Sequence, residues 1–487
     1  MLLDSTRPLQ HTPTISRPLV VDLDGTLLRS DVLIESGFCY LKSTPSRFLT
    51  PLVWLLRGGK PALKSRLAAE TDLDVSVLPY DPQIVEWINE ERANGRTIVL
   101  ATASHEKYAH AIAEHLELFD EVLATNDQVN LSSHRKKDRL VARFGERGFD
   151  YAGNSRDDLP VWRSADRAYV VNAPAAVRRA AEKAGNVERV FESRAPAPKT
   201  WAKSLRMHQW LKNLLIFLPL LAGHMLGSLQ LLANAVLAFM AFGLCASSVY
   251  LLNDLLDLED DRHHPSKCRR PLASGALPLM HGLAAFPVLL VGAFALALAT
   301  LPWRFSVVLL GYYALTLAYS TVLKRLVMVD VVVLAMLYTV RIVAGTTAIA
   351  THLTFWLLAF SMFIFLSLAL IKRYAELQSM KKRGLNQSRG RGYMASDLEL
   401  VSSLGCASGY LSVLVLAMYI QDPKTAHLYS RPQLIWLACP LLLYWISRTW
   451  IIAHRGHMHD DPIIFAIRDR LSLAVIGLCG LVFWAAI

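Results

Sequence analysis

The chain has 487 residues, of which 53% are hydrophobic and 19% charged, and its mean hydropathy is +0.32. This composition excludes a disordered chain and disfavours a purely soluble enzyme. Residues 1–200 carry 27 Lys+Arg and 27 Asp+Glu, whereas residues 201–487 carry 24 and 13 and so hold all of the net charge of +11. A basic and apolar second half predicts a membrane domain with cationic loops rather than a nucleic-acid-binding protein. The six cysteines form no CxxC pair, which is typical of core residues in a reducing compartment.

The first part of the chain predicts a soluble α/β domain. Residues 1–18 contain no apolar core of signal-peptide length, so we expect this domain to stay in the cytoplasm. Short apolar strands alternate with helical stretches, which predicts a doubly wound parallel sheet whose ligands bind at the carboxyl ends of the strands. The expected strands are 18–23, 97–102, 121–124, 149–153 and 168–171. The expected domains are a tail at 1–17, the α/β domain at 18–193 with a helical cap at about 31–80, a Pro/Ala linker at 194–200 and the membrane domain at 201–487.

The second part predicts an all-α membrane domain of about nine transmembrane helices, from apolar runs of about bilayer-spanning length. They lie near 212–227, 229–252, 282–301, 304–322, 327–348, 353–371, 400–420, 433–452 and 471–487. The alternate loops at 253–281, 323–326, 372–399 and 453–470 carry 16 Lys/Arg between them. By the positive-inside rule these loops are cytoplasmic. We therefore expect a multi-pass protein of the inner (cytoplasmic) membrane with its N-terminal domain in the cytoplasm.

Two carboxylates follow the first expected strand, in the sequence DxDGT formed by Asp22 to Thr26. Such a pair can hold Mg²⁺, with one Asp attacking phosphorus while the other moves a proton. Thr102 ends the second strand and can donate a hydrogen bond to a phosphoryl oxygen. Lys136, or its neighbour Lys137, can neutralise a phosphate. The acidic loop YAGNSRDD at 151–158 closes the set.

This ordered set resembles the haloacid dehalogenase-like phosphatases over roughly residues 18–190. The resemblance implies Asp22 as nucleophile, Asp24 as acid/base and Mg²⁺ as cofactor, with Asp158 near the metal. It also implies that Thr102 and Lys136 bind phosphate. Asn154 departs from the family, in which many members have Asp at this place. The alternative is therefore a docking or sensing module without phosphatase activity. The apolar run Phe48–Leu56 in the cap is either cap core or a membrane-facing patch.

A second acidic motif, NDLLDLEDD, begins at Asn253 and ends the second expected span. Asp254, Asp257 and Asp261 are spaced i, i+3, i+7, which would stack three carboxylates on one face of a helix. Carboxylates at a membrane edge are costly unless they are paired or bind cations, and Mg²⁺ with a diphosphate is the natural partner. Lys267, Arg269 and Arg270 follow in the sequence and could clamp phosphates.

This motif, together with HPxKxxRPLASG after it, resembles the UbiA family of intramembrane prenyltransferases over most of 201–487. The resemblance implies that Asn253, Asp254, Asp257 and Asp261 bind a Mg²⁺-diphosphate. The family usually has a second aspartate-rich motif. Here Asp330 has no Asp four residues later, which disfavours a prenyl diphosphate donor.

Three other stretches, at 206–213, 372–376 and 461–470, resemble the polyprenyl-phosphate phosphoribosyltransferase branch of that family. A donor of this type, phosphoribosyl diphosphate, needs cations for its 5-phosphate. The resemblance implies a polyprenyl phosphate as acceptor and a lipid bilayer as environment. The candidate substrate-binding residues are Lys212, Asn213, Lys324, Arg341, Lys372, Arg373 and Tyr374.

The expected function is a bifunctional membrane enzyme. Its membrane domain would transfer 5-phosphoribose to a polyprenyl phosphate, and its soluble domain would remove the 5-phosphate from the product. The alternative is a UbiA-type polyprenyl diphosphate transferase acting on an aromatic acceptor, with the soluble domain a separate phosphatase or a docking module.

Overall fold

The computed structural model describes residues 17–127, 129–192, 198–384, 392–422, 428–458 and 461–487. The chain divides into two compact units. The first contains residues 1–204 and 252–284, and the second contains residues 205–251 and 285–487. Most of the expected tail at 1–17 and of the expected linker at 194–200 lies outside the described residues.

The first unit is built on a six-stranded parallel sheet in the order β3-β2-β1-β4-β5-β6. Because β2 and β4 flank β1 on opposite sides, the direction of winding reverses at β1, and a crevice is expected at the carboxyl end of that strand. The expected α/β doubly wound class is confirmed. Strand β6 was not predicted, because its sequence VERVF places two exposed charged residues on an edge strand. The strands are β1 (Leu19–Val21), β2 (Ile98–His105), β3 (Glu121–Thr125), β4 (Asp150–Gly153), β5 (Ala168–Val171) and β6 (Val187–Phe191).

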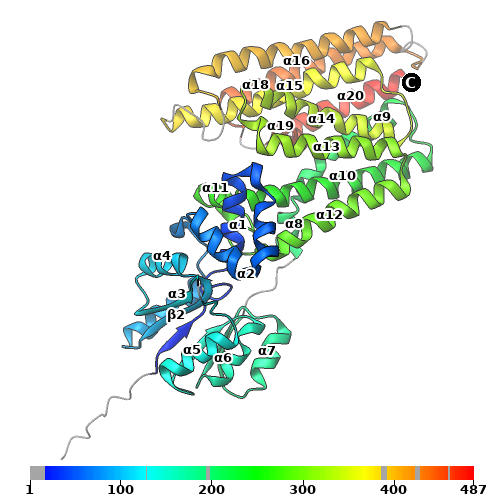
Figure 1. Ribbon diagram of the computed structural model, residues 1–487. Helices are drawn as coiled ribbons and strands as arrows, with labels where there is room; N and C mark the ends of the chain where they lie inside the picture. Colours follow the sequence, from blue (N-terminus) through cyan, green and yellow to red (C-terminus); the bar gives the residue numbers. More distant parts are fainter. Residues whose placement is uncertain (1–16, 128, 193–197, 385–391, 423–427, 459–460) are drawn as a thin grey trace, which may run out of the picture. The chain divides into compact units, whose positions relative to one another are not determined.

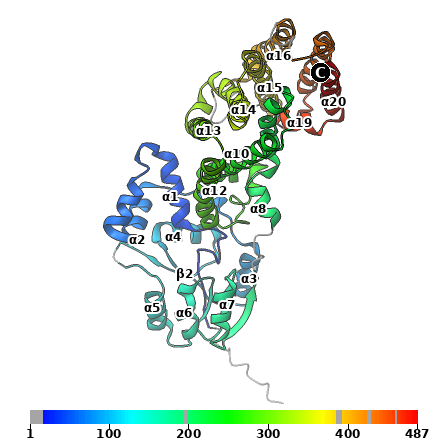
Figure 2. The same ribbon diagram turned by 90° about the vertical axis from the view of Figure 1, so that its right-hand side faces the viewer.

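Helices cover both faces of this sheet because its apolar side chains alternate in direction. Leu19 and Val21 pack in a core with α3 (Pro82–Ala93) and α4 (Glu106–Leu116). Val20 packs in a second core on the opposite face. The helices of that second core lie in a row in both ribbon views (Figures 1 and 2). They are α5 (His134–Phe144), α6 (Leu159–Ser164) and α7 (Ala175–Glu182), with η3 (Arg156–Asp158) before α6.

The cap contains α1 (Val32–Ser43), η1 (Pro45–Arg47), α2 (Thr50–Glu70) and η2 (Val75–Val77). Helix α2 is kinked at Gly59, where φ is 66°. Its C-terminal half is seated on the domain through the buried residues Leu67 and Ala68, whereas its N-terminal half is exposed. The first unit also contains α8 (Pro198–Ser204), α11 (Leu258–His263) and η5 (Lys267–Arg269).

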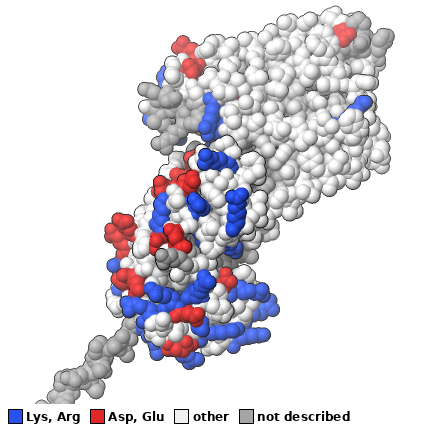
Figure 3. All heavy atoms as spheres, viewed as in Figure 1, with Lys and Arg blue, Asp and Glu red and all other residues white. Residues whose placement is uncertain are grey.

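The second unit is helical. Figure 3 shows a broad face of it on which hardly any Lys, Arg, Asp or Glu appears, as expected for a surface in contact with lipid. Its short elements are η4 (Met207–Phe217), α9 (Leu218–Ala222), η6 (Leu323–Arg325), η7 (Ala395–Asp397), η8 (Pro432–Leu437) and α19 (Pro462–Arg468). Its longer helices, two of which extend into the first unit, are α10 (Leu229–Leu256), α12 (Leu279–Thr300), α13 (Trp303–Thr321), α14 (Val329–Ala348), α15 (Phe355–Lys382), α16 (Leu398–Gln421), α18 (Ala438–His454) and α20 (Arg470–Ala486).

Among the described residues, six helices are long and apolar enough to cross a membrane, and they correspond to six of the nine expected spans. These are α10, α12, α14, α15, α16 with η7, and α18 with η8. The other three expected spans are not confirmed. The run 212–227 forms η4 and the five-residue helix α9, which begins near Pro219 and ends at Gly223. Helix α20 is shorter than the six, and α13 is not among them.

A glycine on α14 lets η4 lie unusually close to that helix. A Cβ on Gly345 would stand 2.2 Å from the backbone oxygen of Ile216. Small residues at helix contacts permit such approach inside membrane domains. This contact brings η4 close to Arg341, which lies one helical turn before Gly345 on α14.

Candidate functional sites

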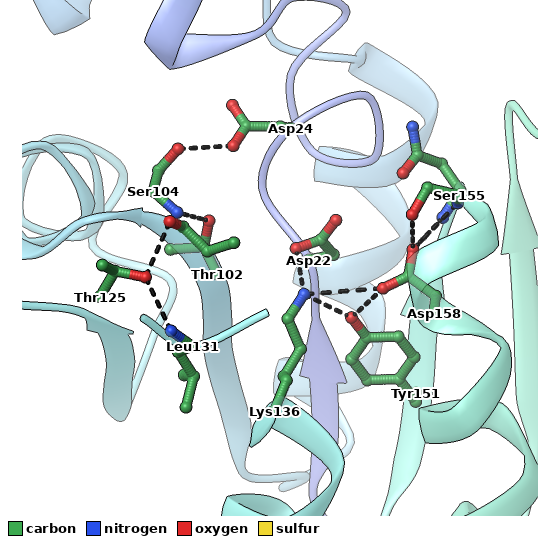
Figure 4. A network of polar contacts seen from close by, with 12 residues as sticks. Asp22, Asp24, Thr102, Ser104, Thr125, Leu131, Lys136, Tyr151, Ser155 and Asp158 are labelled. Atoms are coloured by element: carbon green, nitrogen blue, oxygen red, sulfur yellow. Dashed lines mark hydrogen bonds and ion pairs between the residues drawn. The ribbon is translucent and has the colours of Figure 1, made fainter. Parts of the chain in front are cut away.

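The first candidate site lies where β1 ends (Figure 4). Asp22 directly follows the strand, and Gly25 turns the chain with φ of 75°. A side chain at position 25 would also collide with Asn154, whose Nδ2 lies 1.9 Å from the place of a Cβ. The glycine of DxDGT is therefore required for two reasons: its backbone conformation and the close approach of the loop after β4.

A buried network joins Asp22 to the loop after β4 (Figure 4). Lys136 Nζ donates to Asp22 Oδ1 at 2.7 Å and to Tyr151 Oη at 2.9 Å, and Tyr151 donates to Asp158 Oδ1 at 2.7 Å. Burial alone would lower the pKa of Lys136, but the carboxylates of Asp22 and Asp158 raise it. The structure thus places Lys136 beside Asp22, whereas Lys137 pairs with Asp138 and is partly exposed.

Asp24 points away from this network toward the end of β2. Its Oδ2 accepts a hydrogen bond from Ser104 Oγ at 2.5 Å and its Oδ1 accepts one from the amide of Val32 at 2.8 Å. Burial raises the pKa of Asp24 to about 7, and the nearby Asp31 adds to that rise. Burial likewise raises the pKa of Asp22 to about 6, against the lowering effect of Lys136. A carboxyl group with a pKa near neutrality can both give and take a proton.

Thr102 is fully buried in the second half of β2, which continues three residues beyond the expected end of that strand. Its Oγ1 accepts a hydrogen bond from the amide of Ser104 at 2.9 Å. Its own hydroxyl hydrogen has no acceptor among the hydrogen bonds of the described residues, so it can be given to a phosphoryl oxygen.

The loop after β4 offers a different metal ligand from the one expected. Asp158 Oδ2 already accepts hydrogen bonds from the amides of Asn154 and Ser155 and from Ser155 Oγ, at 3.1, 2.9 and 2.9 Å. By contrast, Asn154 Oδ1 is buried with no hydrogen-bond partner among the described residues. An amide oxygen is a suitable ligand for Mg²⁺. Within the described residues, no cluster of three His, Cys, Asp or Glu has the geometry of a metal site. A Mg²⁺ ion at this site would therefore be held by the Asn154 amide oxygen together with Asp22 and Asp24.

Lys64 is a residue of this site that the sequence analysis missed. It belongs to α2 of the cap, and its Nζ donates to the carbonyl oxygen of Ala103 at 2.7 Å, between Thr102 and Ser104. Burial lowers the pKa of Lys64, and the charges of Asp24 and Asp31 oppose that effect. A cation on the cap thus reaches the strand end that carries the catalytic candidates. Its only signal in the sequence was a Lys without a nearby acidic partner.

The second candidate site is the acidic motif after α10. The expected single helical face is wrong, because α10 ends at Leu256 and Asp257 is the N-cap of α11, with non-helical φ and ψ of −101° and 17°. Asp254 and Asp261 nevertheless converge, since both form ion pairs with the guanidinium of Arg270. Lys267 Nζ lies 4.0 Å from Asp261 Oδ1. Two buried carboxylates that share one cation fit a divalent metal as well.

The third candidate site is a group of cations in the second unit. Lys212 of η4 donates to Asp461 Oδ2 at 2.7 Å, and Lys372 of α15 lies 3.5 Å from the same oxygen. Tyr338 Oη donates to Asp461 at 3.1 Å, and its ring lies 5.5 Å from Lys212 Nζ. Asp461 and Tyr338 were not among the expected site residues. Asp461 begins the stretch 461–470, which resembles the phosphoribosyltransferase branch. That resemblance was the signal in the sequence that could have identified Asp461 as a site residue.

Arg341 also lies near the Tyr338 ring, 5.6 Å from its centre. Its Nε donates to Asn213 Oδ1 at 3.0 Å and its Nη2 donates to Tyr312 Oη at 3.3 Å. Within the described part of the chain it pairs with no carboxylate. Among the described residues, Lys212, Lys372 and Arg341 together therefore have one neutralising carboxylate, Asp461. Lys212 and Arg341 are buried and Lys372 is partly exposed, and excess positive charge of this kind suits an anion.

Arg373 belongs to a different group from the one expected. It forms ion pairs with Asp330 and with Glu376, and it is almost fully buried. Tyr393 donates a further hydrogen bond to Asp330 Oδ1 at 2.6 Å. A buried guanidinium with two carboxylates is already neutralised, so Arg373 ties α14 to α15 rather than facing a substrate.

The remaining expected residues lie elsewhere. Tyr374 Oη shares a hydrogen bond of 2.9 Å with His454 Nδ1 on α18, and Lys324 lies half-buried on η6. Asn253 lies in the last turn of α10, next to Asp254.

Comparisons with known proteins identify the families of the two parts of the chain. Residues 216–474 match the UbiA prenyltransferase family, and residues 19–163 match the haloacid dehalogenase-like hydrolases. The chain belongs to the UbiA prenyltransferase family. Its N-terminal part is a haloacid dehalogenase-like hydrolase domain, so the chain is a UbiA-type transferase with a fused hydrolase domain.

Relatives of this UbiA protein come from several bacteria. The protein y4nM of Sinorhizobium fredii is 37% identical over 93% of this chain and 88% of its own. Nodulation protein NoeC of Azorhizobium caulinodans is 38% identical over 58% of this chain and 92% of its own. Decaprenyl-phosphate phosphoribosyltransferase of Mycolicibacterium smegmatis is 29% identical over 57% of this chain and 90% of its own. A solved UbiA homologue from Archaeoglobus fulgidus bound to GPP and Mg²⁺ is 20% identical over 58% of this chain and 99% of that chain, with a TM-score of 0.45.

Proposed function

We propose that the membrane domain transfers the 5-phosphoribosyl group of phosphoribosyl diphosphate to a polyprenyl phosphate. The bond between C1 of ribose and the diphosphate oxygen breaks, a bond from C1 to an oxygen of the lipid phosphate forms, and diphosphate leaves. The relatives named decaprenyl-phosphate phosphoribosyltransferase support this reaction. The lipid phosphate is already an anion, so the reaction needs no strong general base.

The observation that carries the proposal is the excess positive charge around Asp461. Lys212, Lys372 and Arg341 offer three cations to one carboxylate, which is the requirement of a phosphate group on the donor or the acceptor. The acidic motif is proposed to take the diphosphate, with Asp254 and Asp261 holding Mg²⁺ and with Arg270 and Lys267 close enough to bind phosphate oxygens. When bound, Mg²⁺ supplies charge stabilisation to the departing diphosphate.

A prenyl diphosphate donor with an aromatic acceptor is the second candidate, which the family as a whole favours. The environment of Asp330 argues against it. Asp330 stands where a second metal-binding motif is expected, but its carboxylate is held by Arg373 and Tyr393.

We further propose that the hydrolase domain removes the 5-phosphate from the lipid-linked product. Asp22 would attack phosphorus and form a phosphoaspartate, and Asp24 would give a proton to the departing ribose oxygen. Water would then release inorganic phosphate, with Asp24 taking up the proton of that water. Thr102 and Lys136 would bind phosphoryl oxygens, and Mg²⁺ on Asp22, the backbone at Asp24 and Asn154 would supply further charge neutralisation. We place the protein in the cytoplasmic membrane with this domain in the cytoplasm.

The test uses purified full-length protein in detergent with Mg²⁺, polyprenyl phosphate and radiolabelled phosphoribosyl diphosphate. Wild type is expected to give lipid-linked ribose, whereas Asp22→Asn is expected to stop at lipid-linked ribose 5-phosphate. If neither protein puts label into lipid, the donor assignment is wrong and prenyl transfer becomes the leading interpretation. If both stop at the phosphorylated lipid, the hydrolase domain acts on another substrate or is a docking module.

A further inference from the structure

The N-terminal half of helix α2 and the two residues before it present an apolar surface to solvent. Its residues are far more exposed than large apolar side chains in a domain core, with Leu56 at 77% and Phe48 at 64%. The same surface includes Leu49, Leu52, Val53 and Leu55, and we call these six residues the cap patch. A contiguous exposed apolar surface on a soluble domain marks a contact with a partner or with a membrane.

The charge around the cap patch favours a lipid surface over a protein. Residues 36–69 contain six Lys or Arg and neither Asp nor Glu. Arg47, Arg57 and Lys60 are exposed and lie directly beside the cap patch. Apolar side chains flanked by cations are the pattern of segments that lie in the interface of a membrane containing anionic lipids. The chain itself places this domain near a bilayer, since six of its helices can span one.

Contacts inside the first unit tie the cap to the segment that follows a membrane-spanning helix. Glu35 of α1 pairs with Arg262 of α11, and both side chains are buried. Lys42 of the same helix pairs with Asp260 at 2.7 Å. Helix α11 begins two residues after the end of α10. The cap thus contacts a segment that directly follows a helix long and apolar enough to span a membrane.

Helix α2 also connects the cap patch with the hydrolase site. Lys64, in its C-terminal half, reaches Ala103 between Thr102 and Ser104. Leu56 and Lys64 belong to the two halves of α2, one on each side of the kink at Gly59. The same element therefore carries the exposed apolar patch at one end and a contact with the hydrolase site at the other.

We propose that the cap patch inserts into the headgroup region of a membrane with anionic lipids, and that the hydrolase site beneath the cap takes a phosphate group carried on a membrane lipid. The second part rests on the proposed phosphatase function, whose substrate is also lipid-linked. Docking at the bilayer raises the local concentration of a lipid-borne substrate without any new contact at the reacting phosphorus.

A photocrosslinking experiment on the full-length protein tests docking without reference to activity. Benzoylphenylalanine is placed at position 56, and the protein is irradiated in nanodiscs of phosphatidylglycerol or of phosphatidylcholine. Position 129 is the control, because Val129 of the same domain is 49% exposed and lies outside the cap. A lipid adduct at 56, at least fivefold stronger in phosphatidylglycerol and stronger than at 129, supports the proposal. An adduct with a second protein chain, or no adduct, would overturn it.

A kinetic comparison tests the substrate class. In anionic nanodiscs, Leu56→Asp and Arg57→Glu are expected to slow dephosphorylation of lipid-linked ribose 5-phosphate at least tenfold and to leave hydrolysis of p-nitrophenyl phosphate within twofold of wild type. Both side chains are exposed, so neither change disturbs a core. Equal turnover of the lipid substrate by wild type and variants would overturn the lipid-substrate part even if the adduct forms. Failure of the proposed phosphatase function is distinct, since wild type itself would then leave lipid-linked ribose 5-phosphate intact, with or without hydrolysis of p-nitrophenyl phosphate.

Discussion

Lys136 Nζ lies 2.7 Å from Asp22 Oδ1, and both side chains are buried at the end of β1. The two residues are 114 positions apart in the chain, so α5 and β1 meet with a cation opposite the proposed nucleophile. That arrangement keeps Asp22 oriented and places a positive charge where a phosphate would bind.

Replacement of this cation gives the first prediction. Lys136→Met should lower hydrolysis of p-nitrophenyl phosphate by about 10²-fold or more, because loss of one preorganised charge costs roughly that much. Lys137→Met is the matched control and should stay within about threefold, since Lys137 is partly exposed and forms its ion pair with Asp138. Steady-state rates of p-nitrophenyl phosphate hydrolysis by the full-length variants test this prediction. Comparable losses in both variants would contradict the assignment.

The raised pKa of Asp24 gives a second prediction, for stability in EDTA. Its pKa is about 7 in the folded protein against 3.8 for the free side chain. Between these values the folded state holds a proton that the unfolded state has lost. The group therefore stabilises the fold at low pH, and stability falls as pH rises from about 4 to 7.

Thermal unfolding across that pH range checks this sign. Asp24→Asn should flatten the decline, because an amide does not titrate. Asp157→Asn is the control, since Asp157 lies in the same region of the fold but is exposed. A decline that persists unchanged in Asp24→Asn would show that another group is responsible.

The ion pairs of Arg270 give a third prediction, for the transferase. Arg270→Ala removes the cation shared by Asp254 and Asp261 and should lower kcat/KM for phosphoribosyl transfer by about 30-fold or more, as for loss of one partner of a buried charge pair. Arg269→Ala should have little effect, because its side chain is exposed one residue away. Radiolabel transfer into lipid measures both. Equal activities would remove Arg270 from the site.

Arg341 gives a fourth prediction, on substrate affinity. Its guanidinium bonds Asn213 and Tyr312 and lacks a carboxylate partner among the described residues. Arg341→Met should therefore raise KM for phosphoribosyl diphosphate or for the lipid phosphate by about 10-fold or more, since a charge-assisted phosphate contact contributes roughly 1.5–3 kcal/mol. Arg304→Met, at an exposed position on α13, is the control. An unchanged KM for both substrates in Arg341→Met would exclude the phosphate role.

The Arg373–Asp330 pair gives a fifth prediction, on stability. Arg373→Met should destabilise the protein by about 3–5 kcal/mol, because it leaves Asp330 buried without its partner. The double variant Arg373→Met/Asp330→Asn should recover part of that loss. Thermal unfolding in detergent measures both. If Arg373→Met instead raised KM at an unchanged unfolding temperature, the sequence-based expectation of a substrate contact would stand.

The sequence alone determined the features that are local or periodic. The sequence predicted the DxDGT turn and the acidic motif after α10 because the residues of each motif lie close together in the chain. It predicted the parallel sheet because strands and helices alternate along the chain. The long membrane helices were predicted because the length of an apolar run indicates a span. The run 212–227 shows that such a length does not guarantee one continuous helix.

Only the tertiary structure decided which charges meet. Asp461 lies 249 residues from Lys212, and Asn154 reaches the turn at Gly25 from the loop after β4. Arg373 was expected beside a substrate, but packing of α15 against α14 places it on Asp330. A buried charge pairs with whichever opposite charge the packed elements bring within a few ångströms, and that choice depends on the fold rather than on spacing along the chain.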